Sequence, residues 1–143
     1  MNHEPVAIVI AWLKSVAGVS ASVSNRIASM FNESVVLPAI AVTNARGGPV
    51  ATAGGIDTVY DWQITVYALA GKTGTGLDYP DYPAASAVAA QIVTAIRAVG
   101  AGHHYVSTSG AKIVDAEVFS MTRTENASGD ATVILTLDIR VAD

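Results

Sequence analysis

The chain of 143 residues contains no cysteine and little charge, because only 14% of its residues are Asp, Glu, Lys or Arg, against about 25% in an average soluble domain. The absence of cysteine excludes disulfide scaffolds, thiolate zinc sites and thiol catalysis, and it fits a reducing compartment. Eight basic residues and a net charge of −4 do not form the basic surface with which proteins bind nucleic acid. Small polar residues or another protein must therefore cover the outside of this domain.

Long hydrophobic runs are also missing, although 51% of the residues are apolar. The longest uncharged helix-like run, residues 82–96, is shorter than the 18 or so residues of a membrane span. The apolar stretch 6–13 follows His3 and Glu4 instead of a basic segment, which does not match a signal peptide. We expect a non-secreted chain with no membrane span that forms one domain over residues 1–143.

Two segments have the pattern of helices. Residues 4–17 begin with Pro5 in the first turn and end before Gly18, and apolar residues cover nearly the whole circumference. We expect this helix to be buried all round, either as a central core helix or against a neighbouring subunit. Residues 83–99 carry one apolar side, which predicts a helix that packs on a sheet. The intervening segment 20–32 gives no clear prediction.

Four segments have the pattern of strands: residues 35–44, 57–69, 111–124 and 131–141. The second and the last alternate cleanly between apolar and polar residues, which predicts strands with one buried face. The alternation of the third shifts phase over residues 117–119, which either a bulge or an environment with two buried sides could produce. We expect the last strand to lie near a sheet edge that is available for pairing between subunits.

The motifs that usually carry chemistry are weak here. The sequence at positions 71–73, Gly-Lys-Thr, resembles the end of a phosphate-binding loop, but Val66 occupies the position of the required earlier glycine. The adjacent His103 and His104 would point to opposite faces of an extended segment and could not easily share a metal ion. We therefore predict no cofactor and no metal site.

Asp115 and Glu117 lie two residues apart in a predicted strand, so both side chains share one face. Such a pair could hold a cation or act in acid–base catalysis. It more often forms a solvated face or pairs with Lys and Arg, because perturbed carboxylates are frequently only structural. We predict no catalytic residue and no enzymatic activity.

Two long segments rich in glycine, residues 45–55 and 71–83, are predicted to be loops, and loops of this length are usually functional. The aromatic and proline residues at positions 79–83 suit protein contacts, although the tyrosines could equally cap the following helix and close the core. Arg46 is either a contact residue or only solvated. The candidate interaction residues are Arg46, Gly47, Gly48, Pro49, Lys72, Thr73, Asp78, Tyr79, Asp81 and Tyr82.

The order of the elements resembles the tail terminator, or tail-completion, proteins of long-tailed bacteriophages. The resemblance rests on residues 11–14 at the end of the first helix, 37–42 and 62–68 in strands, 89–98 in a helix and 133–141 in the closing strand. These segments are weak individually, and together they span most of the chain. The Gly-rich insertion and residues 20–33 depart from the usual pattern of the family.

The resemblance implies an α+β fold, with a single small mixed or antiparallel β-sheet, helices packed on one face and subunits that assemble into a ring, typically a hexamer. Such a ring caps the tail tube, joins it to the head-side connector protein and lets DNA pass through its lumen without specific binding. The implied location is the head–tail junction of the virion, with assembly in the host cytoplasm. The alternatives are another head-to-tail joining protein, such as a stopper or adaptor, and a small-ligand-binding or enzymatic α+β domain.

Overall fold

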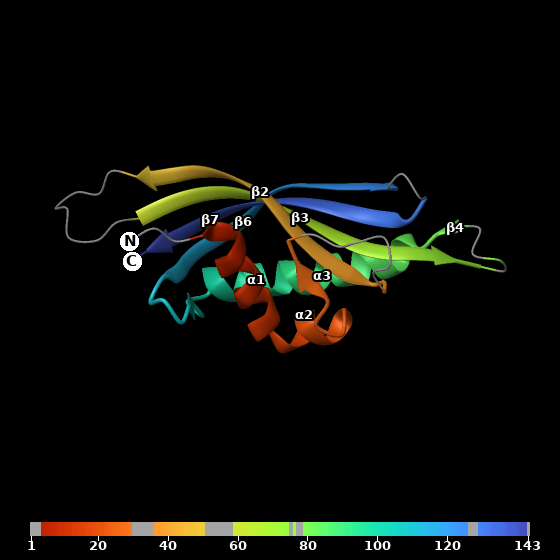
Figure 1. The fold of residues 1–143 in the computed structure, drawn as a ribbon, viewed down its shortest axis with the longest axis horizontal. Coiled ribbons are helices and arrows are strands. Elements are labelled where there is room, and N and C mark those ends of the chain that lie inside the picture. Colours follow the sequence, from red (N-terminus) through yellow and green to blue (C-terminus); the bar gives the residue numbers. More distant parts are fainter. Residues whose placement is uncertain are drawn as a thin grey trace.

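The fold is one strongly twisted sheet with all three helices on the same side (Figure 1). The computed structural model describes residues 4–29, 36–50, 59–74, 76, 79–125 and 129–142. Within them the sheet has seven strands in the order β1-β2-β3-β7-β6-β5, and β4 pairs with β3. The parallel pair of β1 and β2 makes the sheet mixed, and every other pairing is antiparallel. The predicted α+β fold is confirmed.

The N-terminal helical region consists of two helices, α1 (Pro5–Ser15) and α2 (Ala17–Ser22). The Glu4 carboxylate accepts a hydrogen bond of 3.1 Å from the Val6 N–H and so caps α1. Val16 leaves the helical conformation, with φ −87° and ψ 112°. The prediction of one helix ended by Gly18 is therefore wrong, because the break comes at Val16 and Gly18 lies inside α2.

Helix α1 is buried on one side only. Ile8, Val9, Trp12 and Leu13 are buried in the core, whereas Ala7 and Ala11, one turn apart, are exposed. The expectation of burial all round is wrong for the single subunit, because the side turned away from the sheet is exposed in the part of the chain that the structure describes. The exposed positions of the first turns are thus the small apolar residues Ala7 and Ala11, whereas the last turn exposes the polar Lys14 and Ser15.

Strand β2 (Ala39–Val50) is longer than predicted and follows the short strand β1 (Ile27–Ala28). It begins after the cis Leu37–Pro38 bond and continues through the glycine segment, where residues 46–50 pair with residues 59–63. The predicted loop at 45–55 is therefore wrong as far as Val50, and residues 51–55 lie outside the described part of the chain. A register shift between Thr43 and Arg46 broke the alternation and concealed the strand.

The centre of the sheet is formed by β3 (Val59–Thr73), β7 (Ala131–Ala142) and β6 (Lys112–Glu125). β7 pairs with β3 on one side and with β6 on the other, so the prediction that residues 131–141 lie near an edge is wrong. The clean alternation of β7 produces one wholly buried face toward the helices, formed by Ala131, Val133, Leu135, Leu137, Ile139 and Val141. Of the two explanations for the phase shift in β6, the bulge is confirmed, because the register shifts between Val118 and Ser120.

Helix α3 (Tyr82–Gly100) crosses the sheet and contacts β3, β6 and β7. Its predicted apolar side is buried, including Val88, Ile92 and Val99, while Gln91 and Arg97 are exposed. Within the described residues, α3 is the one helix whose length and composition would allow it to cross a membrane. A core helix meets the same criterion, and α3 buries its apolar side against the sheet (Figure 1).

Candidate functional site

Four of the candidate interaction residues, Arg46, Gly47, Gly48 and Pro49, lie in β2 instead of in a loop. Gly47 has φ +131°, and a Cβ at this position would collide with the backbone carbonyl of Asp61 on β3. Gly48 has open space around it. The glycine at position 47 therefore lets two strands approach closely, and Arg46 is presented as an exposed side chain on the outer edge of the sheet.

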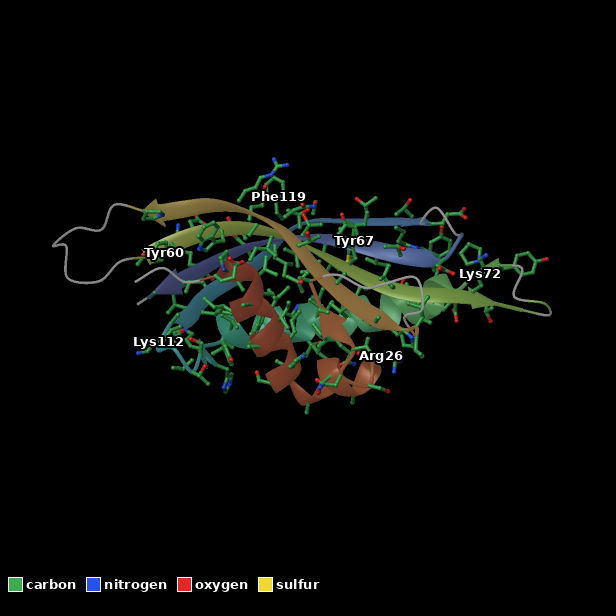
Figure 2. All side chains as sticks on the ribbon, viewed as in Figure 1. Arg26, Tyr60, Tyr67, Lys72, Lys112 and Phe119 are labelled. Atoms are coloured by element: carbon green, nitrogen blue, oxygen red, sulfur yellow. The ribbon has the colours of Figure 1, made fainter. Side chains whose placement is uncertain are left out.

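The second group of candidates surrounds a small hairpin at the other end of β3. Lys72 and Thr73 belong to β3 and pair with Pro80 and Tyr79 of β4 (Tyr79–Pro80), so the predicted loop at 71–83 is partly strand. Asp78 lies outside the described residues. Tyr79 is 66% exposed, and Figure 2 shows Lys72 at the same end of the molecule.

Asp81 and Tyr82 have structural contacts of their own. The Asp81 carboxylate accepts a hydrogen bond of 3.2 Å from the Ala84 N–H and caps α3. The guanidinium of Arg123 on β6 lies 4.8 Å from the centre of the Tyr82 ring, within the range of a cation–π contact. The two tyrosines therefore differ: Tyr82 packs against the core, whereas Tyr79 is exposed.

The face of the sheet opposite the helices carries a group of carboxylates that sequence patterns alone could not assemble. Asp61, Asp138 and Glu117 come from the adjacent strands β3, β7 and β6. The pKa of Asp138 is raised to about 6, mainly by a hydrogen bond with the Asp61 side chain, then by desolvation and by the negative charges of Asp61 and Glu117, while Arg140 lowers it. Two carboxyl groups so close share a proton more readily than they both ionise.

Asp115 and Glu117 do share this face, as predicted, and both side chains are exposed. Asp115 lies opposite Arg140 and Glu117 opposite Asp138. His103 and His104 are exposed after the end of α3. Across the residues that the structure describes, no group of three or more His, Asp or Glu side chains could hold a metal ion.

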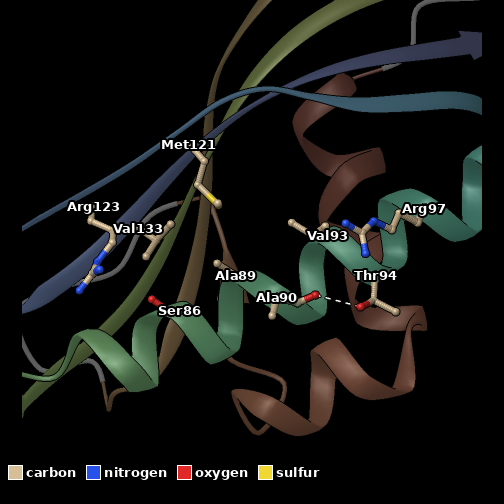
Figure 3. A pocket seen from close by; sticks show the side chains of 9 residues that line it. All are labelled: Ser86, Ala89, Ala90, Val93, Thr94, Arg97, Met121, Arg123 and Val133. Atoms are coloured by element: carbon tan, nitrogen blue, oxygen red, sulfur yellow. Dashed lines mark hydrogen bonds between the residues drawn. The ribbon is translucent and has the colours of Figure 1, made fainter.

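Among the grooves on the helix side of the sheet, two lie beside its outer strands and are mainly apolar. The first, of about 330 Å³, lies between α3 and β6 and is shown in Figure 3. Its wall includes Ala89, Ala90 and Val93 of α3 and the exposed Met121 of β6, and Arg97 and Arg123 also line it. The space between α3 and β6 stays open because the side chains of α3 that face it are small.

The second groove, of about 360 Å³, lies between α1 and β2. Val6, Ala7 and Ile10 of α1 and Val42 of β2 give it an apolar wall, and Glu4 lies at its border. The two grooves are thus beside β6 and β2, the two long outer strands of the sheet. Neither groove was predicted, because each depends on residues that are far apart in the sequence.

Comparison with known proteins identifies a family and a related fold. The family model described as "Tail completion protein gp17" matches residues 7–140. A chain from the solved structure titled "Virion of native gene transfer agent (GTA) particle" is similar in fold, with a TM-score of 0.62 and 17% sequence identity. The similarity covers 96% of this chain and 93% of that chain. No curated protein sequence matches significantly.

Proposed function

The chain belongs to the tail completion protein gp17 family and is a structural component of bacteriophage tail assembly, and we propose that it acts as a ring. In this proposal the ring, typically a hexamer, caps the completed tail tube and joins it to the head-side connector protein. The subunit assembles in the host cytoplasm and remains at the head–tail junction of the virion. It makes and breaks no covalent bond.

The observation that carries this proposal is the position of the two candidate interaction segments. The end of β2, at Pro49 and Val50, lies at one end of the long axis of the subunit, and β4 with Tyr79 lies at the opposite end (Figure 1). A ring of such subunits with the strands running roughly along its axis would present one segment on each of its two faces. A protein that joins two partners needs two such faces.

The charge of the helix-free face supports the passage of DNA without binding. Four carboxylates and two guanidinium groups lie on this face: Asp61, Asp115, Glu117 and Asp138, with Arg46 and Arg140. Affinity for DNA comes mainly from cations that release counterions from phosphates. A surface in which carboxylates predominate offers little of this gain, so DNA could slide past it.

The same residues support a structural role over catalysis. Asp115 and Glu117 are exposed side chains on a strand, and neither lines one of the two grooves. Catalytic carboxylates usually lie in clefts, where burial and neighbouring charges adjust their pKa values. We therefore propose that these two residues form part of an interaction or lumen surface.

The test is assembly with the tail tube protein of the same bacteriophage. Mass photometry should show a ring-sized species at micromolar concentration, alone or with tubes present, and electron micrographs should show rings on tube ends. A chain that remains monomeric with tubes present would refute the proposal. Rings that bind portal–adaptor complexes and ignore tubes would instead identify a stopper or adaptor.

A further inference from the structure

Within the residues that the structure describes, the two long outer strands of the sheet are each paired on their outer side at one end only, and these ends are opposite. On its outer side β2 pairs with β1 at Ile40 and Ala41, and β6 pairs with β5 (Tyr105–Val106) at Lys112 and Ile113. No other strand in the described part of the chain pairs with the outer side of either one. Unpaired backbone N–H and C=O groups along a strand edge are a template for pairing with another chain.

The strand directions allow a second copy to continue the sheet. β2, β3, β7 and β6 alternate in direction, because each neighbouring pair is antiparallel. A copy placed beside β6 in the same orientation therefore brings its β2 next to β6 in the antiparallel sense. We infer that subunits of the proposed ring join through β6 of one copy and β2 of the next; this inference rests on the function proposed above.

The uncovered parts of the two edges lie at matching levels of the sheet. We call residues level when they lie in one row of directly paired positions across the strands. Arg46 is level with Gln63, Asp138 and Glu117 in this sense. Residues 42–48 of β2 are thereby level with residues 115–121 of β6, outside the parts that β1 and β5 cover. Both segments also contain a register shift at this level, between Thr43 and Arg46 and between Val118 and Ser120. Two bulged edges can therefore meet with regular pairing on either side.

Charge complementarity favours these unlike edges as partners. At equal level, the exposed Arg46 of one copy lies opposite the exposed Glu117 of the next, on the helix-free face. A slip of two residues would keep the side chains on their faces and would still leave Arg46 near Asp115. Pairing of β6 with a second β6 would instead bring like charges together, and like charges across an interface are strongly unfavourable.

The helix side of the same contact has matching shapes. Met121 is 57% exposed on β6 and is level with Val66 and Leu135 on the intervening strands, and with Val42 on β2. Val42 lines the groove between α1 and β2. In the proposed pairing, Met121 of one copy therefore enters the groove of the next, where Val6, Ala7 and Ile10 would cover it. The flexible thioether side chain of methionine suits such a groove.

Charge reversal tests the contact through its own electrostatics. Arg46→Glu and Glu117→Arg should each raise the concentration needed for ring assembly at least about tenfold, since each puts like charges across the contact. The double variant Arg46→Glu/Glu117→Arg should restore assembly. Lys14→Glu is a matched control, because Lys14 is exposed on α1 and does not line the groove beside β2. Independent effects of the two reversals, with no restoration, would overturn the pairing of Arg46 with Glu117.

Disulfide cross-linking tests the register. The chain has no cysteine, so Thr43→Cys/Ser120→Cys introduces the only thiols, at positions that are level across the sheet. Directly opposite residues bring their Cβ atoms to about 5 Å, close enough for a disulfide after small adjustments. Oxidation should give a ladder of covalent oligomers up to the whole ring. Thr43→Cys/Lys112→Cys, with its second thiol on the part of β6 that β5 covers, should give none.

The outcomes separate this inference from the proposed function. If the wild-type chain forms rings but the oxidised Thr43→Cys/Ser120→Cys variant gives no ladder of covalent oligomers, the edge contact is overturned and the proposed ring is not. A ladder only with Thr43→Cys/Thr122→Cys would overturn the equal-level register. A wild-type chain that never forms rings, even with tail tubes, would overturn both the contact and the proposed function.

Discussion

Asp61 and Asp138, on neighbouring strands of the helix-free face, share a hydrogen bond between their side chains that raises the pKa of Asp138 to about 6. The raised pKa means that the folded state holds a proton that the unfolded chain releases at its ordinary pKa near 3.8. The stabilisation from this proton is fully present below about pH 3.8 and is lost as the pH rises through about 6. At neutral pH the two carboxylates therefore repel each other in the folded state.

Asp138→Asn should make the chain more stable at neutral pH, because the amide can donate a hydrogen bond to Asp61 without carrying a charge. We expect its melting temperature to exceed that of the wild type by a few degrees at pH 7.5, corresponding to about 1 kcal/mol, and the difference to shrink at pH 4.5. Differential scanning fluorimetry at both pH values measures this. Asp115→Asn, on the same face and away from Asp61, is the control; an equal and pH-independent gain in both variants would contradict the shared proton.

Asp81→Ala should destabilise the fold by about 1 kcal/mol, because it removes the side chain that caps the Ala84 N–H at the start of α3. Urea unfolding followed by circular dichroism gives the free energy of unfolding. Asp81→Asn should retain most of the stability, since Asn caps helices about as well as Asp. Ser86→Ala, an exposed change in the same helix, should have little effect. Equal losses for Asp81→Ala and Ser86→Ala would mean that the cap is not important.

Gly47→Ala should cost about 2 kcal/mol or more, because φ is +131° and the new Cβ would collide with the Asp61 carbonyl. Gly48→Ala is the matched control one residue away, with open space around its Cβ. It should leave the free energy of unfolding within about 0.5 kcal/mol of the wild type. If both variants unfolded at the same urea concentration, β2 and β3 would not approach each other closely at this point.

Tyr79→Ala should weaken binding to the proposed partner at the β4 end of the subunit without affecting folding, because Tyr79 is 66% exposed. Aromatic residues often dominate the energy of protein interfaces, so we expect the affinity to fall at least about tenfold. Co-sedimentation with tail tubes and with head-side connector rings, measured separately, shows which partner is lost. Val106→Ala, an exposed apolar change on β5, is the control. Unchanged binding to both partners would remove Tyr79 from the proposed contacts.

The segments with a regular period were predicted well from the sequence. The alternation of residues 131–141 and the one-sided apolar pattern of residues 83–99 became β7 and α3, and the phase shift in β6 marked a real bulge. The errors came where local signals conflict with tertiary contacts. The glycines at 47 and 48 indicated a loop, but Gly47 lies in a strand because its missing side chain admits the backbone of β3.

The prediction of interaction residues was also correct for some positions and wrong for others as regards exposure. Composition drew attention to Arg46 and Tyr79, and both are exposed. Asp81 was selected for the same reason, although its side chain caps α3. The proton-sharing pair of Asp61 and Asp138 was missed, because only the register of β3 against β7 brings these positions together. The sequence indicated only that Asp61 and Asp138 each occupy a polar position in an alternating strand.

The sequence by itself determined the buried faces of α3 and β7, because periodic burial depends on local spacing. The order of its elements carried the resemblance to tail-completion proteins and the α+β class that the resemblance implies. Strand order was decided by the tertiary structure alone. It placed β7 in the centre and left β2 and β6 as the outer strands, since pairing partners are chosen by long-range contacts that no local pattern encodes. The low content of charged residues is therefore reflected in the exposed Ala7 and Ala11 of α1 and in the two apolar grooves beside β2 and β6.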